Sequence, residues 1–229
     1  MLPAPLTTAS SETRQRLIEA AAEVFAAEGF RCATVRQICA RAKANVAAIH
    51  YHFGGKEEIY RELLRELGRR AFERYPPTLG LPANPTQEQR LFAFVHAFLL
   101  RVLSDDGFAR HGRVLSREMI DPSPAIDHVV EEFLRPSFDY LRGIVAALLG
   151  PGAGEREVRL AARSIVAQCA FYHHARALIE RLSPAEPRDP AAIRALAEHV
   201  TQFSLEGLRG LRSREPGPAR APASPSASA

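Results

Sequence analysis

The segment from Thr34 to Lys56 constrains the fold of this chain more than any other. Apolar residues recur in its first part at the spacing of one helical stripe, at Val35, Ile38, Cys39 and Ala42. Thr34 precedes the stripe and is a favourable N-cap, because its hydroxyl can accept a hydrogen bond from a free backbone N–H. Lys43 and Ala44 then form a turn, and Asn45 caps a second helix. The segment therefore predicts two short helices joined by a tight turn.

The second of these helices carries residues that packing does not explain. Three of its residues are expected to face the core: Val46, Ile49 and Phe53. Small and polar residues remain, namely Ala47, Ala48, His50, Tyr51 and His52. A short helix with small residues near its N-terminus can enter a DNA major groove, where alanine contacts thymine methyls and polar neighbours reach base edges and phosphates. The pattern favours a helix-turn-helix over a helical hairpin with a merely solvated outer face.

The same stretch resembles the N-terminal domain of TetR-type transcriptional regulators. In that family, the second and third helices end in a Leu-Tyr-x-His-Phe-x-x-Lys run, and here the run is Ile49-His50-Tyr51-His52-Phe53-Gly54-Gly55-Lys56. The preceding Ala-Glu-Gly-Phe, from Ala27 to Phe30, and Thr34 match as well. The Asn-Val-Ala-Ala that opens the second helix is similar to the CecR-like branch. Two positions depart from the pattern, because Lys43 replaces the usual turn glycine and His50 replaces the first aromatic residue.

The resemblance implies a set of DNA-binding residues. Lys56 is expected to contact a phosphate, and Arg36 to reach the DNA unless it is only a solvated arginine. His52 could equally be a packing histidine. The full expected set is Thr34, Arg36, Asn45, Ala47, Ala48, His50, Tyr51, His52 and Lys56.

Helical periodicity continues along the rest of the chain without a competing strand pattern, so the expected fold class is all-α. An N-terminal three-helix DNA-binding domain is expected to precede a C-terminal helical bundle for ligand binding and dimerisation. Further helices are expected near residues 12–28, 56–74, 87–104, 108–120, 124–149, 155–182 and 190–211. The expected division is a disordered arm at 1–11, the DNA-binding domain at 12–58, the bundle at 59–212 and a disordered tail at 213–229.

A ligand site is expected inside the bundle. The helix at 87–104 is apolar on nearly every side, and its His96 would need a partner if buried. In the family, such a bundle encloses a pocket whose occupancy tilts the fourth helix and spreads two DNA-reading heads. The expected lining is Phe94, Phe98, Glu118, Tyr172 and His173. Alternatively, the polar members of this set pair with one another in a closed core.

The last two helices carry more apolar surface than one flank of a monomer requires. On 155–182 these residues are Ile165, Cys169, Tyr172, Ala175 and Ile179, and on 190–211 they are Ile193, Leu196, Val200, Phe203, Leu205 and Leu208. The resemblance implies a four-helix dimer interface, and a twofold dimer suits a palindromic operator. A homodimer through residues 155–212 is therefore expected, the alternative being that both helices are interior.

Composition and motifs narrow the function further. The net charge is +4 and the only two lysines, Lys43 and Lys56, flank the second helix, which suits a polyanionic partner. Neither a membrane-spanning run nor a secretory signal is visible, so the chain is expected to be cytoplasmic. The three cysteines lack metal spacing, and the adjacent His173 and His174 point about 100° apart on a helix, so no metal or cofactor is expected.

No G-x-S-x-G, H-E-x-x-H or P-loop motif occurs, so an enzyme is not expected. The sequence instead favours a sequence-specific DNA-binding transcriptional regulator. We expect a repressor that a small-molecule effector releases from a palindromic operator. The alternative is an all-α ligand-binding or helical-bundle protein that does not bind DNA.

Overall fold

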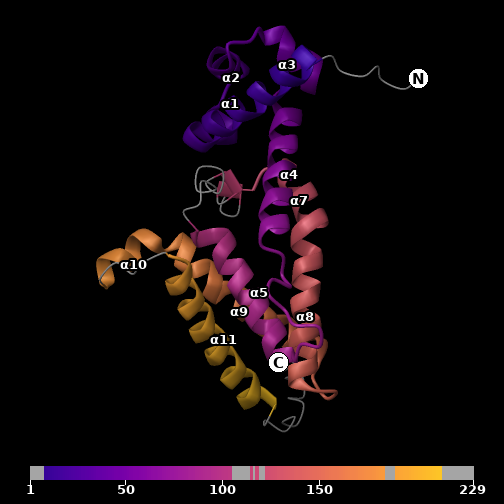
Figure 1. The fold of residues 1–229 in the computed structure, drawn as a ribbon, viewed down its shortest axis with the longest axis vertical. Coiled ribbons are helices and arrows are strands. Elements are labelled where there is room, and N and C mark those ends of the chain that lie inside the picture. The colour runs from indigo at the N-terminus through magenta and orange to yellow at the C-terminus, as the bar shows by residue number, and fades with distance from the viewer. Residues whose placement is uncertain (1–7, 105–113, 116, 119–121, 184–188, 213–229) are drawn as a thin grey trace, which may run out of the picture.

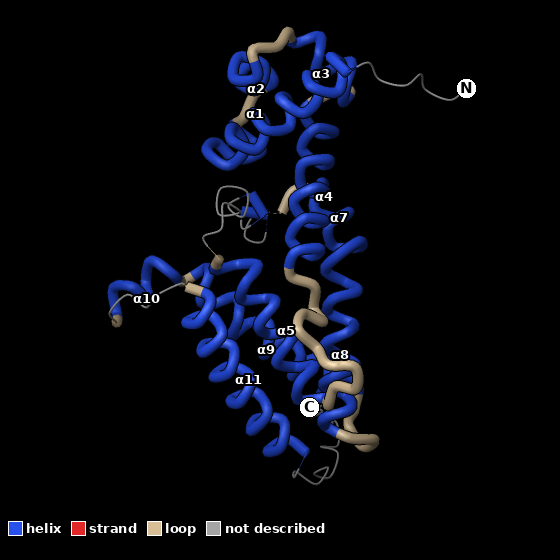
Figure 2. The backbone as a smooth tube through the Cα atoms, in the orientation of Figure 1, coloured by secondary structure: helices blue, strands red, loops and turns tan. Residues whose placement is uncertain are grey.

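The computed structural model describes residues 8–104, 114–115, 117–118, 122–183 and 189–212 (Figure 1). Every regular element in these ranges is helical, which confirms the expected fold class (Figure 2). Helices α1 (Thr8–Cys32), α2 (Val35–Ala42) and α3 (Val46–Phe53) form one end of the molecule. Helix α4 (Lys56–Arg74) leads from this end into the remaining helices.

The rest of the chain forms the C-terminal bundle. Its main helices are α5 (Gln87–Leu103), α8 (Arg135–Leu149), α9 (Glu155–His174) and α11 (Pro190–Arg212). A 3₁₀ turn (Pro124–Ile126), α7 (Asp127–Val129) and a π turn (Val130–Leu134) lead into α8, and the short α10 (Arg176–Leu182) lies between α9 and α11. Most of the helix predicted at 108–120 lies outside the described residues.

The molecule has two hydrophobic cores. The first joins α1, α2, α3 and part of α4 to three residues from further along the chain, Val114, Ala125 and Val129. The second joins α5, α8, α9 and α11. Helix α4 crosses residue 58 without a break, and its Ile59, Leu63 and Leu67 belong to the first core. The predicted division of the chain at residue 58 therefore falls inside one continuous helix and stays a prediction.

Several helix starts are fixed by side-chain caps. Thr86 and Gln89 form a capping box at the start of α5, in which each side chain bonds the other's backbone N–H. Ser123 caps the turn that opens with Pro124, and Asp189 accepts hydrogen bonds from two backbone N–H groups of α11. These caps are local, which is why the sequence reveals them.

The N-terminal arm was predicted too long. Helix α1 begins at Thr8, so residues 8–11 are helical and not disordered. Residues 1–7 and the predicted tail at 213–229 lie outside the described residues. At the other end of α1, Gly29 has a positive φ of 77°, but its ψ of 169° is not that of a left-handed helix. A further helical turn follows it and ends at Cys32.

Two later helices also differ from the prediction. The predicted helix at 155–182 is broken at Ala175, with φ of −91° and ψ of 11°, into α9 and α10. No glycine or proline marks this break, so local sequence does not reveal it. The predicted helix at 124–149 is not one regular α-helix, because a π turn directly precedes α8. Pro136 lies in the first turn of α8, where a missing N–H is tolerated.

Candidate functional site

Helix α2 is held at its start by a reciprocal cap. Thr34 Oγ1 accepts a hydrogen bond from the backbone N–H of Gln37 at 3.2 Å, and Gln37 Oε1 accepts one from the backbone N–H of Thr34 at 2.8 Å. The capping role predicted for Thr34 is confirmed. Arg36, in the first turn after the cap, is exposed.

The turn between α2 and α3 uses a left-handed residue that is not glycine. Lys43 has φ of 50° and ψ of 46°, and it is the single non-glycine residue with positive φ in the described ranges. A Cβ is disfavoured in this conformation, so the turn is strained. Asn45 then caps α3 as predicted, with its Oδ1 accepting from the Ala47 N–H at 3.0 Å.

The exposed face of α3 differs from the predicted one at two positions. Ile49 and Phe53 are buried as expected, but Val46 is 38% exposed. Val46 shares their helical face yet lies in the first turn of an eight-residue helix, where the core ends. Ala48 instead packs partly against the first core, whereas Ala47 is exposed and Tyr51 is 76% exposed. The outward surface of α3 is therefore made by Val46, Ala47, His50 and Tyr51.

The two histidines of α3 are placed differently. His50 Nδ1 lies 3.1 Å from the carbonyl oxygen of Gly54, at the end of its own helix. If Nδ1 carries the proton of the neutral ring, only an acceptor remains at Nε2, so a neutral His50 cannot donate to a phosphate. His52 is half-buried between the rings of Tyr51 and Phe53, with centroid distances of 5.0 and 6.2 Å. Its packing role is thus observed, and a DNA role stays a prediction.

Lys56 contacts the end of α1. Its Nζ donates to the carbonyl oxygen of Arg31 at 3.3 Å and lies 4.7 Å from the ring centroid of Phe30. Phe30 in turn stacks on Tyr60 of α4 at 4.7 Å. The ammonium group therefore ties α4 to α1, and its predicted phosphate contact would have to share this position.

The residues predicted to line the ligand site do not all meet. Phe94 is buried in the second core, and Phe98 and Tyr172 pack against that core. His173 lies in the last turn of α9, beside His174. Glu118 lies apart from the other four, because it accepts a hydrogen bond from Tyr60 Oη at 2.6 Å and others from Ser123, and its predicted ligand role stays a prediction. Those partners belong to the region of the first core.

His96 is not the buried, isolated imidazole that the sequence suggested. It is half-buried, and its ring stacks on Phe92 at 5.4 Å between centroids. Burial and the nearby positive charge of Arg194 lower the pKa of His96. The imidazole therefore faces α11.

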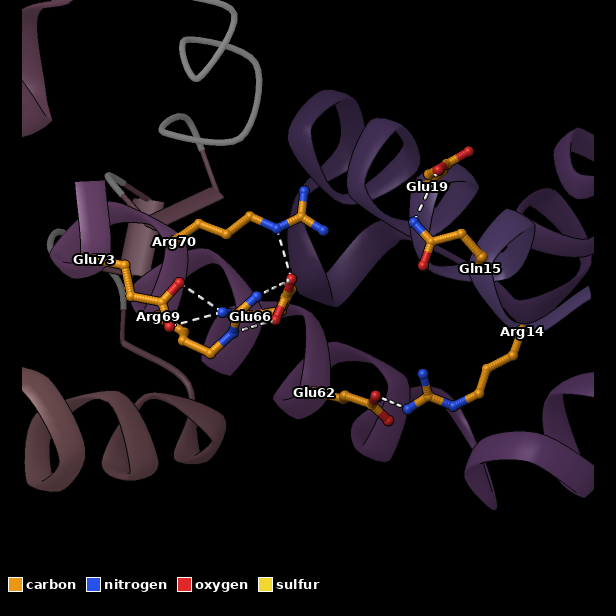
Figure 3. Close-up of polar contacts among 8 residues, drawn as sticks. All are labelled: Arg14, Gln15, Glu19, Glu62, Glu66, Arg69, Arg70 and Glu73. Carbon is orange, nitrogen blue, oxygen red and sulfur yellow. Dashed lines mark hydrogen bonds and ion pairs between the residues drawn. The ribbon is translucent and has the colours of Figure 1, made fainter. Parts of the chain in front are cut away.

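Two hollows lie elsewhere on the described surface. One, of about 840 Å³, lies between α1, α4 and the π turn and is lined mainly by arginine and glutamate side chains. Arg69 binds Glu66 and Glu73, Arg70 also binds Glu66, and Arg14 of α1 pairs with Glu62 (Figure 3). Arg69 first, and Arg70 after it, hold the pKa of Glu66 at about 2. The charges of this hollow largely satisfy one another.

The other hollow, of about 450 Å³, lies between α5 and α11. None of the five predicted ligand-site residues lines either hollow. Sequence reasoning also missed Arg101, whose guanidinium carbon lies 4.3 Å from the Phe72 ring centroid at the end of α5. Its signal in the sequence is an arginine within an otherwise apolar helix.

The described part of the chain shows neither a metal site nor a membrane-spanning helix. No group of three or more histidine, cysteine or acidic residues there could hold a metal ion. None of the helices described is long and apolar enough to cross a membrane.

The capped pair α2 and α3, with the exposed surface of α3 at one end of an all-helical molecule, defines a helix-turn-helix protein. Comparison with known proteins specifies the class. Residues 87–208 match the family described as the C-terminal domain of the HTH-type transcriptional dual regulator CecR. Residues 17–63 match the family described as bacterial regulatory proteins, tetR family. The chain belongs to the TetR-type transcriptional regulators, on the CecR-like branch, and is a DNA-binding transcriptional regulator.

Individual relatives agree. The dual regulator CecR of Shigella flexneri is 27% identical over 177 residues, which cover 71% of this chain and 76% of that one. The repressor NicS of Pseudomonas putida is 34% identical over 94 residues, covering 40% of this chain and 44% of that one. FadR from Bacillus subtilis, solved in complex with stearoyl-CoA, superposes with a TM-score of 0.62 at 20% identity, covering 84% and 98% of the two chains. This last likeness supports the fold alone.

Proposed function

We propose that this chain is a dimeric repressor that binds a twofold DNA operator and is released from it by a small-molecule effector. The observation that carries the proposal is the exposed surface of α3. This helix lies at one end of the molecule, and the C-terminal bundle forms the other end (Figure 1). One relative is named a repressor and another a dual regulator, and repression is the simpler outcome for a protein that occupies a promoter.

In the proposed complex, α3 lies in the major groove. Ala47 and Val46 offer methyl groups to thymine, and the exposed ring of Tyr51 is available to contact the DNA. Arg36, at the exposed start of α2, faces a phosphate on one side of the groove. The Thr34 and Asn45 caps fix both helix starts, so their contribution to binding is chiefly to position the helices.

The proposed dimer uses the apolar residues that the protomer leaves exposed. Most of those predicted on the last helix are buried within the protomer itself, including Ile193, Val200, Leu205 and Leu208. Leu196 is partly buried, and Phe203 is 64% exposed. Further large apolar side chains are exposed on α9 and α10, namely Leu160, Phe171, Leu178 and Leu182. Exposed apolar residues of this size mark association surfaces when they are contiguous.

The proposed effector binds in the C-terminal domain. Phe94, Phe98, Tyr172 and His173 remain the proposed contacts, and all four lie in or against the second core or at the end of α9. FadR from Bacillus subtilis binds stearoyl-CoA, which supports a small-molecule effector for a protein of this fold. Release requires the effector to bind the DNA-incompetent state more tightly, since equal affinity for both states shifts nothing.

Footprinting on the DNA that flanks the chain's own gene tests the proposal. We expect purified wild-type protein to protect an inverted repeat whose half-sites are about one helical turn apart. A variant with Tyr51→Ala and Arg36→Ala should protect it only at much higher protein concentration, while retaining the wild-type melting temperature. Equal protection by wild type and variant would contradict the assignment of the DNA-binding surface.

A further inference from the structure

Arg101 connects two helices across the middle of the molecule. It lies in the last turn of α5, and its Nη1 donates a hydrogen bond to the carbonyl oxygen of Tyr75, the residue that ends α4. Its guanidinium carbon lies 4.3 Å from the ring centroid of Phe72 and 5.7 Å from that of Phe98. The cation therefore lies beside two aromatic rings and against the C-terminal end of α4, the helix that leads to the DNA-binding end of the molecule.

Arg101 has no counter-charge among the residues that the structure describes. The titratable neighbour that acts on it there is Cys169, whose thiol pKa burial raises to about 12. Burial also lowers the pKa of Arg101 to about 10, so near neutral pH the arginine is charged and the thiol is neutral. By surface exposure Arg101 is half-buried, and a charge taken partly out of water without an opposite charge lowers the stability of the folded state.

The surroundings of Arg101 differ from those of the other arginines nearby. Arg69 and Arg70 of α4 are exposed and paired with glutamates (Figure 3). The guanidinium of Arg101 has five N–H donors, and the Tyr75 carbonyl is its one described acceptor. A guanidinium is a rigid fork that matches carboxylate and phosphate oxygens, and aromatic rings beside it provide apolar walls.

We propose that Arg101 binds the anionic group of an organic effector whose apolar part lies along Phe72 and Phe98. This inference rests on the proposed function, because it names the class of effector. Carboxylates and phosphate esters share the required chemistry. An anion that takes the Nη1 donors of Arg101 competes with the Tyr75 carbonyl, and so weakens the link between α5 and the end of α4. The effector site and the DNA-binding end would be coupled through this link.

The experiment compares three probes with the same alkyl chain on the full-length protein. Isothermal titration calorimetry, below the micelle concentration, would measure the Kd of dodecanoate, dodecyl phosphate and neutral dodecanol. We expect wild type to bind at least one of the two anions about tenfold or more tightly than dodecanol. The stronger of the two anions identifies the headgroup class.

Variants of Arg101 test whether this residue causes the tighter binding of the anionic probes. Arg101→Met should abolish the preference and Arg101→Lys should keep part of it, while neither should lower the melting temperature. Arg194→Met is the matched control, because Arg194 also lies over a ring, that of Phe92 at 5.0 Å, but pairs with Glu198 at 3.1 Å. This control should retain the full preference.

Three results would overturn the inference: binding of none of the probes, equal binding of dodecanol and both anions, or a preference that survives in Arg101→Met. Asp105 follows Arg101 by four residues in the sequence and lies outside the described residues. A fourth result is therefore energetic coupling between Arg101→Met and Asp105→Asn in a double-mutant cycle of unfolding, which would show that the chain supplies its own counter-ion. DNA binding by the unliganded protein is measured separately, so failure of the effector site is distinguishable from failure of the proposed function.

Discussion

Lys43 illustrates a conflict between backbone conformation and charge at a single residue. Its φ of 50° favours glycine, yet its ammonium group lies in the turn beside the proposed DNA-binding helix. We predict that Lys43→Gly raises the free energy of unfolding by up to about 1 kcal/mol, because the strain of the Cβ is removed. The same change should weaken DNA binding, since a cation near the phosphates is lost.

The matched control for this prediction is Lys43→Ala, which removes the charge but keeps a Cβ. It should lose DNA affinity as Lys43→Gly does, without the gain in stability. Urea unfolding and fluorescence anisotropy on an operator duplex measure the two effects. Equal stability of the glycine and alanine variants would contradict the conformational account.

Val46 carries a prediction about sequence preference. Because it is 38% exposed, Val46→Ala should change the free energy of unfolding by no more than about 0.5 kcal/mol. Loss of its methyl groups should alter which bases are selected from a pool of random duplexes. Ile49→Ala is the contrasting variant three residues on, and as a buried residue it should cost about 2–5 kcal/mol. An unchanged selected sequence for Val46→Ala would exclude a base contact by this residue.

At the scale of the helices, the contact between Arg117 and the C-terminal part of α1 gives a prediction about stability. Arg117 Nη2 donates to the carbonyl oxygen of Ala27 at 3.2 Å, and a Cβ at Gly29 would lie 2.7 Å from Arg117 Nη1. Gly29 also has φ of 77°. We predict that Gly29→Ala costs about 1–3 kcal/mol of unfolding free energy, through backbone strain and this close approach.

A double-mutant cycle separates the two causes. In an Arg117→Ala background the close approach is absent, so Gly29→Ala should cost less than in wild type, although the backbone strain remains. Denaturant unfolding of the four proteins provides the measurement. An identical cost in both backgrounds would mean that Arg117 simply moves aside.

The helices show which features a sequence reveals and which it does not. Caps at Thr34 and Asn45 were predicted because a short polar side chain and the backbone it bonds lie within a few residues. The exposure of Val46 and the location of Glu118 could not be predicted in this way. Both depend on where distant segments pack, and the partner of Glu118, Tyr60, lies 58 residues away in the sequence.

The same distinction holds for the candidate sites. The DNA-binding segment was predicted because its motif is contiguous, from Thr34 to Lys56. The proposed effector site is harder to predict, because its residues come from separate helices. Helical periodicity within each helix does not show which faces of different helices meet. Arg101 was missed for this reason, since its neighbours Phe72, Tyr75 and Cys169 come from α4, its C-terminal end and α9.

For the whole molecule, the proposed dimer gives a test at the exposed apolar residues. We predict that Phe203→Glu shifts the protein from dimer to monomer at micromolar concentration, because it places a charge where a second copy would bury an aromatic ring. Gln202→Glu adds the same charge on the side of α11 that faces the hollow beside α5, and should leave the dimer intact. Light scattering coupled to size-exclusion chromatography distinguishes the outcomes. A Phe203→Glu protein that stays dimeric would place the interface elsewhere.

The most direct test of the central claim is selection of bound sequences from random duplex DNA, followed by anisotropy titration of the winner at several salt concentrations. The account predicts an inverted repeat that binds two protomers, with an affinity that falls steeply as salt rises. It also predicts that a duplex with scrambled half-sites binds more weakly by about 10³-fold or more. Selection that enriches no sequence, or equal affinity for the repeat and the scrambled duplex, would contradict the claim that α3 reads DNA.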